Sequence, residues 1–396
     1  MNIIFHIDVN NAFLSWSAIS LLQDGYPEDI REIPSVIAGD ESKRHGIVLA
    51  KSNISKKYGI KTAETLHSAR QKCKNLQIFP PNYAFYKKMS DRLYEYYLTY
   101  TPDVERYSID ECFLDLTNTN YLYDDVLILA YKMKEEIKEK FGFTVNIGIG
   151  NNKLCAKMAG DFSKPDKVHT LFSNEIKEKM WPLPIEDLLY VGKSSSRELR
   201  KLNIKTIGDL ANFSLPILKK YFKNNATFMI QYANGIDSAR VISKSAKNKS
   251  ISFSETLEFD TNDKDFLKKK ILLMCEKIGF KLREEKLYAR TIAIFVKTDV
   301  FMSYSHQKKL FNETNNTMEL YNNALTMLDE IVANRLVRLI GVRVSDLVNF
   351  KSDQISLFSK VDNQKEDKIQ EVIDDINLKY KDLKIMPAIF YKDKKK

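Results

Sequence analysis

The chain has 396 residues, of which 44% are hydrophobic and 29% charged, a composition typical of a folded protein with roughly two to four domains. Its 62 Lys and Arg residues outnumber 52 Asp and Glu residues, and the net charge of +10 favours a polyanionic partner without establishing one. No apolar run approaches the ~20 residues of a membrane span, which excludes membrane-embedded function classes.

The cysteines and the N-terminus predict a cytoplasmic protein. The four cysteines lie far apart and form no CxxC pair, which argues against a zinc site and against a disulfide framework. The segment MNIIFHIDVNNAF meets an Asp at its eighth residue and so lacks the apolar region of a signal peptide. We therefore expect a reduced, cytoplasmic setting.

In the first part of the chain, apolar runs alternate with helical composition. Residues 3–7 are predicted to form a buried strand that ends at Asp8, and residues 104–116 alternate like a strand hairpin. Further expected elements are helices at 86–100, at 124–140 and from 152, and a strand at 144–149. This order predicts an α/β sandwich with the helices on one face of a sheet.

The second part of the chain changes character. Short helices separated by polar turns are expected over residues 172–235, and the lysine-dotted run at 243–250 is typical of a linker. A second compact unit is then predicted, with strands at 250–258, 290–298 and 336–347 and a helix at 264–285. A charged tail after Asn349 carries the apolar cluster QISLF at 354–358.

Three carboxylates are the strongest candidates for chemistry. Asp8 alone would be a helix cap or a turn former more often than a ligand. Asp110 and Glu111, however, are adjacent carboxylates in an otherwise apolar hairpin, where burying them unpaired is costly. A turn that carries both toward the end of a neighbouring strand makes an oxygen-rich pocket, which suits Mg²⁺. Two such ions would clamp the entering and leaving oxygens of an in-line displacement at phosphorus.

The string YSIDECFLD at 107–115 resembles the S-[IL]-D-E-x-[FY]-L-D signature of the Y-family translesion DNA polymerases, and HIDVNNAF resembles that family's first metal-binding strand. The resemblance implies that Asp8 and Asp110 bridge two Mg²⁺ ions, for which Mn²⁺ can substitute, and that Glu111 completes the ion that activates the primer hydroxyl. Val9 would add a backbone carbonyl, and Asp115 would order the hairpin. Asn10 stands where many members carry a second Asp, a position that is not usually a ligand.

The same resemblance implies a nucleotide pocket. Phe13 would be the steric gate that excludes a 2′-hydroxyl, although a plain core aromatic is the alternative. Asn53 and Lys56 stand where the family usually has Tyr and Arg, and Lys164 falls in the family's second phosphate-binding segment; ordinary surface residues are the alternative. Ile47 and Leu49 would line the roof over the base pair.

Three further segments imply partners. Residues 191–211 resemble a helix-hairpin-helix that grips DNA phosphates, with Ser194 in place of the second hairpin glycine. The unit at 250–349 resembles the family's DNA-gripping little finger. The run that contains Gln354, Leu357 and Phe358 resembles the peptide by which bacterial polymerases dock on the sliding clamp, and local packing is the alternative.

We therefore predict an α+β right-hand polymerase that acts as a monomer and adds dNTPs to a primer 3′-end on template DNA. Its expected parts are a palm (1–12 and 82–171), fingers (13–81), a helical thumb (172–240), a linker (241–249), a little finger (250–349) and a tail (350–396). An inactive DNA- and clamp-binding accessory protein is the alternative function. A nucleotidyl cyclase would need a GG[DE]EF-type hairpin, and a two-metal nuclease would give the gate aromatic and the phosphate lysines no role.

Overall fold

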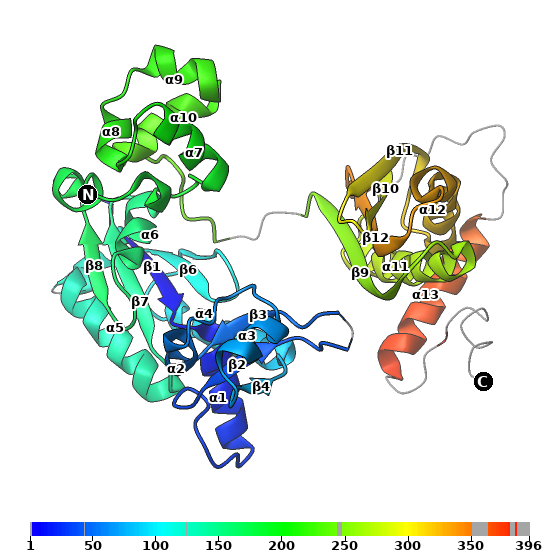
Figure 1. Cartoon of the computed structure of the whole chain (residues 1–396), viewed down its shortest axis with the longest axis horizontal. Helices are drawn as coiled ribbons and strands as arrows, with labels where there is room; N and C mark the ends of the chain where they lie inside the picture. The colour runs from blue at the N-terminus through cyan, green and yellow to red at the C-terminus, as the bar shows by residue number, and fades with distance from the viewer. Residues whose placement is uncertain are drawn as a thin grey trace. The chain divides into compact units, whose positions relative to one another are not determined.

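The computed structural model describes residues 2–42, 44–123, 125–243, 248–350, 363–380 and 385. By its internal contacts the chain divides into two compact units (Figure 1). The first comprises Met1–Gly39 with Gly46–Ser245, and the second comprises Asp40–His45 with Ala246–Lys396.

A five-stranded sheet of order β5-β6-β1-β7-β8 organises the first unit. Its strands are β1 (Ile4–Val9), β5 (Val104–Arg106), β6 (Glu111–Asp115), β7 (Val145–Gly150) and β8 (Val168–Leu171). β1 lies in the centre and pairs antiparallel with β6 and with β7. The central strand therefore places its last residues beside the turn that leads into β6.

Both faces of this sheet are covered, contrary to the prediction of helices on one face. The alternate residues Phe5, Ile7 and Val9 of β1 share a core with α4 (Tyr83–Leu98) and α5 (Val126–Phe141). Ile4 points to the other face and packs with Phe113 and Ala156, a residue of α6 (Lys153–Asp161). Figure 1 shows α5 and α6 on either side of β7.

Helix α6 lies unusually close to β7 because glycines face each other there. A Cβ on Gly148 would come within 2.0 Å of the Ala156 carbonyl oxygen and 2.3 Å of the Gly160 nitrogen. Sequence periodicity does not reveal such an approach, since it depends on two glycines that are twelve residues apart. The close approach brings the side chains of α6 next to the end of β1.

A smaller sheet of order β3-β2-β4 forms the segment expected to be the fingers. Its strands are β2 (Ser35–Ala38), β3 (Val48–Lys51) and β4 (Gln77–Phe79), and its helices are α1 (Ala12–Gln23), α2 (Asn53–Lys57) and α3 (Leu66–Lys72). Ser52 caps α2 and Thr65 caps α3 by accepting hydrogen bonds from backbone N–H groups. The Ser52 cap fixes the start of α2, the helix that carries Asn53 and Lys56.

The segment from residue 172 is helical, as predicted. Its apolar residues form one core together with residues of α6. Its elements are η2 (Ile176–Met180), η3 (Ile185–Asp187), α7 (Lys193–Lys201), α8 (Ile207–Ala211), α9 (Leu215–Phe222) and α10 (Asn225–Ala233). The short helix η1 (Asn120–Leu122) lies earlier in the chain, before α5. A capping box between Thr206 and Asp209 starts α8.

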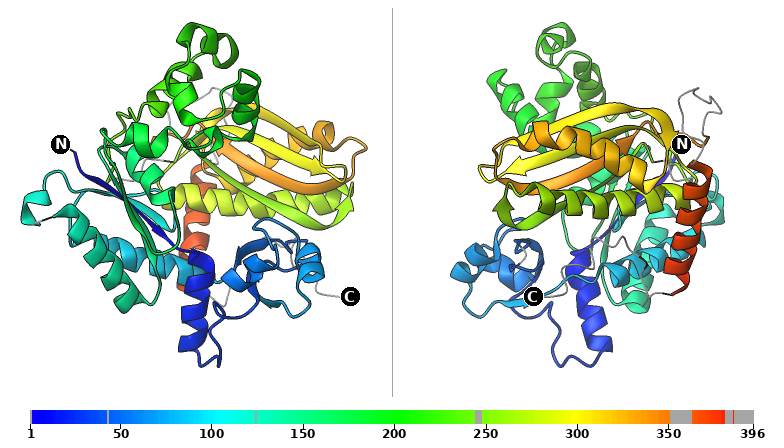
Figure 2. Two further views of the ribbon diagram at one scale, coloured as in Figure 1. Left: turned by 60° about the vertical axis from the view of Figure 1, so that its left-hand side comes forward. Right: turned by 90° about the vertical axis from the view of Figure 1, so that its right-hand side faces the viewer.

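The second unit is a four-stranded antiparallel sheet of order β11-β10-β12-β9 with helices packed against it (Figure 2). Its strands are β9 (Ser250–Thr261), β10 (Ala289–Thr298), β11 (Ser303–Thr314) and β12 (Val337–Ser345). Its helices are α11 (Lys264–Glu284), α12 (Thr317–Val332) and α13 (Asn363–Lys379). The apolar sides of α11 and α12 share one core with β9, β10 and β12. Strand β11 and helix α12 were not predicted from the sequence.

The four cysteines are unpaired and buried, at Cys73, Cys112, Cys155 and Cys275. No helix in the described part of the chain is both long enough and apolar enough to cross a membrane.

Candidate active site

The three residues with the predicted carboxylates lie where β1 ends and β6 begins. Asp8 lies directly opposite Glu111 in the antiparallel pair, so both side chains point to the same face of the sheet. Asp110 precedes the strand, in the bend that leads into it, and its carbonyl oxygen accepts a 3.1 Å hydrogen bond from the Val9 N–H. The strict alternation of a strand therefore does not separate Asp110 from Glu111, as the turn hypothesis required.

Ser108 shapes this bend. Its hydroxyl donates to the Asp110 carboxylate at 2.5 Å and accepts hydrogen bonds from the N–H groups of Asp110 (3.3 Å) and Glu111 (3.0 Å). Asp115, at the far end of β6, accepts a 2.9 Å hydrogen bond from the Thr117 N–H. These contacts fix both ends of the carboxylate-bearing strand.

Each of two carboxylates is paired with a lysine from α6 or the loop after it. Lys157 donates to Glu111 at 2.6 Å, and the buried His6 lies 3.3 Å from the same oxygen. Lys164 pairs with Asp8 and, at 2.9 Å, with Asp161. The sequence analysis did not single out His6 or Lys157. Lysines are common on the surfaces of helices, so Lys157 becomes a candidate only when the close packing of α6 on β7 is known.

Burial and these cations act in opposite directions on the carboxyl groups. Burial by itself favours neutral Glu111, but the hydrogen bonds from His6 and Lys157 outweigh it and lower the pKa to about 2. Burial raises the pKa of Asp8, and Lys164 offsets this only in part. Burial disfavours the charged form of Lys164, but Asp8 and Asp161 reverse this effect and raise its pKa. The site therefore holds closely coupled charges of both signs.

The chemistry of the donors fits divalent metal ions. Carboxylate oxygens of Asp8, Asp110 and Glu111 and the Val9 carbonyl are the hard oxygen ligands that Mg²⁺ prefers. No three side chains of the His, Cys, Asp or Glu type are already gathered as a ligand cluster among the described residues. Each carboxylate has a partner of its own instead: Lys157 for Glu111, Lys164 for Asp8 and Ser108 for Asp110.

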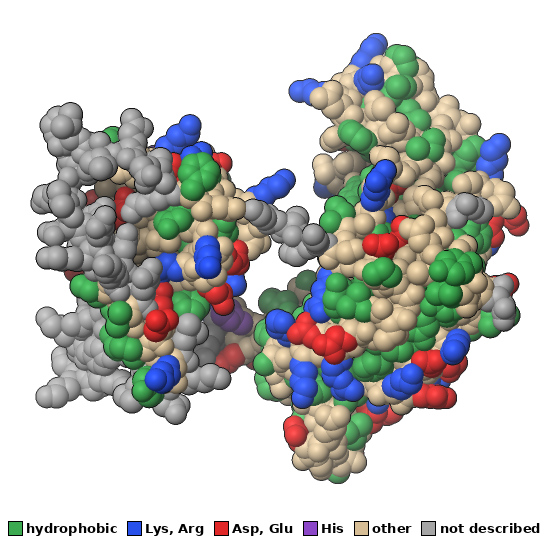
Figure 3. All heavy atoms as spheres, turned by 180° about the vertical axis from the view of Figure 1, so that it is seen from behind, with side chains coloured by type: hydrophobic (Ala, Val, Ile, Leu, Met, Phe, Trp, Pro, Cys, Tyr) green, Lys and Arg blue, Asp and Glu red, His purple; other side chains and the backbone are tan. Residues whose placement is uncertain are grey.

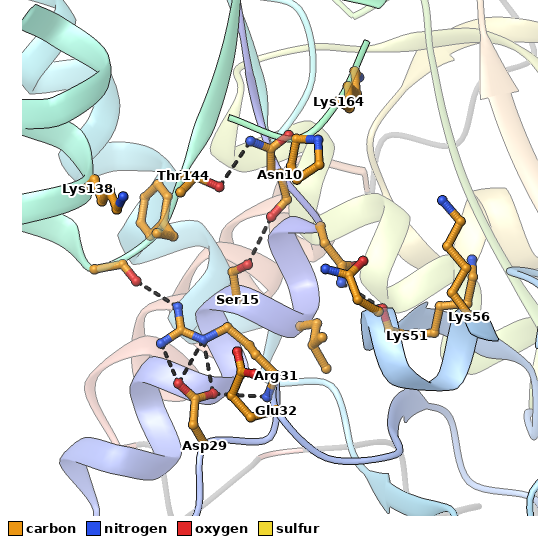
Figure 4. Close-up of a pocket in the computed structure, with 16 residues that line it drawn as sticks. Asn10, Ser15, Asp29, Arg31, Glu32, Lys51, Lys56, Lys138, Thr144 and Lys164 are labelled. Carbon is orange, nitrogen blue, oxygen red and sulfur yellow. Dashed lines mark hydrogen bonds and ion pairs between the residues drawn. The ribbon is translucent and has the colours of Figure 1, made fainter. Parts of the chain in front are cut away.

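A cleft of about 590 Å³ has Lys164 in its lining (Figure 4). Because Lys164 pairs with Asp8, the cleft lies next to that carboxylate. Asn53, Lys56 and Lys164 all line it, so the structure brings together three of the four residues predicted for the nucleotide pocket. Phe13 does not line the cleft, and its half-buried ring stacks on Tyr86 with centroids 4.8 Å apart and planes 10° from parallel. The gate and core-aromatic hypotheses for Phe13 are both compatible with this packing.

Lys51 is a cleft residue that sequence reasoning missed. It ends β3, lines the same cleft and points in the same direction as Lys56 (Figure 4). Partial burial and the proximity of the Lys56 charge lower the pKa of Lys51. Its Nζ donates to Thr62 at 3.0 Å, and its backbone carbonyl accepts a 2.7 Å hydrogen bond from Asn11. The sequence pattern around a lysine at the end of a strand does not predict that its side chain lines a cleft.

Neutral and paired residues form the other end of the cleft (Figure 4). Asn10, which stands where an Asp was considered, donates to the Thr144 hydroxyl at 3.1 Å and so has a structural partner. Arg31 forms a bidentate pair with Asp29 and donates to the Gly142 carbonyl at 2.7 Å. Since Gly142 ends α5, this arginine fastens the finger segment to the large sheet domain.

The expected DNA-binding hairpin needs one correction. Ser194 lies inside α7 and not in the hairpin that precedes the helix. The residue in the left-handed conformation of that hairpin is Tyr190, with φ of 68°, followed by Gly192 at the N-cap. Because a tyrosine stands where glycine is favoured, the sequence revealed the hairpin but not which of its residues replaces the glycine. The Gln354, Leu357 and Phe358 cluster lies outside the described residues.

Comparisons with known proteins show which family the chain belongs to. Residues 7–161 match the model of the impB/mucB/samB family, residues 248–357 match that of its C-terminal domain, and residues 173–204 match the HHH motif of the IMS family. The chain is 43% identical over 394 residues to DNA polymerase IV of Clostridium acetobutylicum, which covers 100% of this chain and 99% of that protein. The chain belongs to the Y-family of DNA polymerases.

Other Y-family proteins are similar over nearly the whole length. DNA polymerase IV of Acetivibrio thermocellus is 34% identical, with 99% of this chain and 98% of that protein covered. Among solved structures, a Y-family Dbh–Dpo4–Dbh chimera superposes with a TM-score of 0.78 at 23% identity, covering 87% of this chain and 99% of the chimera. A Dbh ternary complex gives a TM-score of 0.61 at 24% identity, with coverages of 87% and 98%. The structural likeness shows the shared fold, including the little-finger sheet.

The homology establishes the class of enzyme. This Y-family chain is a DNA-directed DNA polymerase of the translesion type, and this confirms the predicted activity. Polymerases of this family work with divalent metal ions, so the chain requires them.

Proposed function

We propose that Asp8, Asp110, Glu111 and the Val9 carbonyl form the catalytic centre and hold two Mg²⁺ ions, for which Mn²⁺ can substitute. The observation that carries the proposal is the register that sets Asp8 opposite Glu111, with Asp110 in the adjoining bend. When bound, such ions supply activation of the primer 3′-hydroxyl and neutralisation of the charge on the leaving pyrophosphate. The protein itself would hold the oxygen ligands on one face of the sheet.

We propose that the incoming dNTP lies in the adjoining cleft. Asn53, Lys56 and Lys164 would contact the triphosphate, since all three line the cleft and two of them are cationic. Lys56 stands where arginine is usual, and its ammonium binds a phosphate as a single point charge, whereas a guanidinium would form two parallel hydrogen bonds. Phe13, stacked on Tyr86, would limit the space under the sugar and so exclude ribonucleotides. Leu49, half-buried on β3, would border the base.

The remaining partners are proposed from sequence and charge. Primer-template DNA would be gripped by the thumb hairpin and the little finger, in keeping with the net charge of +10. The Gln354, Leu357 and Phe358 cluster would dock on a sliding clamp. We propose that the enzyme works as a monomer in the cytoplasm, where its unpaired cysteines stay reduced.

Primer extension by an isosteric variant tests the catalytic centre. D110N/E111Q keeps the shape of the hairpin but removes two charges, so extension of a primed template with Mg²⁺ and dNTPs is expected to fall by at least ~10³-fold. The matched control is E95Q/E139Q, which alters exposed carboxylates on α4 and α5 and is expected to extend at the wild-type rate. Melting curves and binding of primed DNA show whether each variant is folded.

Two outcomes would contradict the assignment. One is extension by folded D110N/E111Q within tenfold of the wild type, which would place the reaction on other residues. The other is failure of the wild type itself while it binds primed DNA, which would favour the accessory-protein alternative.

A further inference from the structure

Tyr190 occupies a backbone conformation that its side chain does not favour. Its φ of 68° lies in the left-handed region, where a Cβ crowds the backbone and glycine is the usual residue. Burial does not hold the ring there, since the side chain is 68% exposed and its nearest ring, that of Tyr232, has its centroid 5.8 Å away. Strain retained at an exposed residue points to a role for the side chain.

The hydroxyl of Tyr190 reaches the hairpin that carries the catalytic carboxylates. It lies 3.4 Å from the hydroxyl of Tyr107, which is separated from Asp110 by two residues. The hydrogen bond with Tyr107 is the main cause that raises the pKa of Tyr190 to about 12. One end of the contact therefore lies in the hairpin before α7 and the other in the bend before β6.

Tyr107 is firmly attached to the catalytic hairpin. Its N–H donates to the Glu111 carbonyl at 3.0 Å, and its ring stands nearly perpendicular to that of Phe113 with centroids 5.3 Å apart. The Nζ of Lys157, the partner of the Glu111 carboxylate, lies 5.2 Å above the Tyr107 ring. A displacement of Tyr107 would therefore be felt by Glu111 through the backbone and through Lys157.

We propose that Tyr190 is a positioning residue which, through the hydroxyl of Tyr107, fixes the DNA-binding hairpin of the thumb against the carboxylate-bearing hairpin of the palm. The primer strand held by one hairpin then presents its 3′-end to the other in a fixed register. The tyrosine is kept in a left-handed position because glycine, which would fit the backbone better, has no hydroxyl to make this contact. The inference rests on the proposed catalytic centre at Asp8, Asp110 and Glu111.

The test compares Y190F, Y107F, Y107F/Y190F and Y190G with the wild type in single-turnover extension at saturating primed DNA and varied dNTP concentration. Y190F and Y107F keep their rings and lose the hydroxyl, so each is expected to extend about three- to tenfold more slowly, with unchanged KM for dNTP. The double variant is expected to lose no more than either single variant, because both remove the same contact. Y221F is the matched control, since Tyr221 is 56% exposed on α9 of the same thumb.

Y190G separates strain from function. It removes the hydroxyl and relieves the left-handed backbone, so its melting temperature is expected to equal or exceed that of the wild type while extension slows as in Y190F. A clear fall in melting temperature would overturn the inference, because packing of the ring would then explain the tyrosine. Wild-type rates in Y190F and Y107F, or additive losses in the double variant, would overturn it as well.

The result for D110N/E111Q keeps the two proposals apart. If D110N/E111Q is inactive and Y190F extends like Y221F, the positioning role fails and the catalytic assignment stands. If D110N/E111Q extends normally, both fail.

Discussion

At the scale of single residues, Lys51 shows how the cleft is prepared for an anion. A half-buried ammonium next to the Lys56 charge is destabilised, and its pKa falls for that reason. An anionic group placed between the two lysines would stabilise the Lys51 ammonium and raise its pKa again. The phosphates of a dNTP are such groups, and the cleft that both lysines line is where we propose they bind.

Replacing Lys51 is therefore expected to weaken nucleotide binding. K51M keeps most of the aliphatic stem and loses the charge, and the KM for dNTP is expected to rise about three- to tenfold with little change in affinity for primed DNA. Steady-state extension at varied dNTP concentration measures this. K57M is the control, since Lys57 is exposed on the adjacent helix and does not line the cleft. Equal KM values for K51M and K57M would show that Lys51 does not contact the nucleotide.

The residues of the site differ in how far the sequence could reveal them. Asp8, Asp110 and Glu111 were predicted because two adjacent carboxylates in an apolar hairpin are costly to bury unpaired and because the segments around them resemble the family's signature. Lys51 was not found, because its role depends on where β3 ends relative to α2. Tyr190 was not found either, since a tyrosine in a left-handed turn resembles any other loop aromatic.

Elements with a strong apolar pattern were predicted well. Strand β1 was expected at residues 3–7 and is Ile4–Val9, and helix α11 was expected at 264–285 and is Lys264–Glu284. Strand β11 was missed because it lies at the edge of its sheet and exposes half of its side chains. Its polar sequence SYSHQKKLFNET contains few residues that a sheet core requires, so pairing with β10 and not hydrophobicity defines it.

Helix α11 also contains a carboxyl group that is expected to make stability depend on pH. Burial raises the pKa of Glu276 from 4.5 to about 7, and no described residue pairs with it. The folded state then holds this proton more tightly than the unfolded chain, so ionisation lowers stability as the pH rises from about 4.5 to about 7. Above that range the loss is complete.

E276Q is expected to remove this dependence. The free energy of unfolding of E276Q should exceed that of the wild type by about 1–3 kcal/mol at pH 8 and approach it at pH 4. Urea unfolding at the two pH values measures both differences. E258Q, which alters an exposed carboxylate on β9 of the same unit, should change stability equally little at each pH. An E276Q gain that does not vary with pH would have a cause other than this titration.

At the scale of the whole molecule, each of the two units has its own apolar core. Among the described residues, the apolar cluster of the second unit contains none before Ile251, and the clusters of the first unit contain none after Val241. The net charge of +10 is not gathered on the face shown in Figure 3, where Lys and Arg alternate with Asp, Glu and hydrophobic side chains. DNA binding is thus expected to depend on several separated contacts.

A fragment of residues 1–243 tests this division. Because its clusters are self-contained, it is expected to fold, to melt cooperatively and to extend primers. Loss of the linked second unit should weaken binding of primed DNA by about 10- to 100-fold. Fluorescence anisotropy with labelled DNA measures the affinity. A fragment that binds as tightly as the whole chain would show that the second unit does not grip DNA.

The buried cysteines have a consequence for how the enzyme can be studied. Burial raises the pKa of Cys112 and of Cys155 to about 12, and a thiol that keeps its proton is a poor nucleophile. All four cysteines are buried, so a maleimide or a mild oxidant in solution would meet no accessible sulfur on the folded chain. A single cysteine introduced at an exposed position of the thumb would therefore accept a dye selectively, without removal of any native residue.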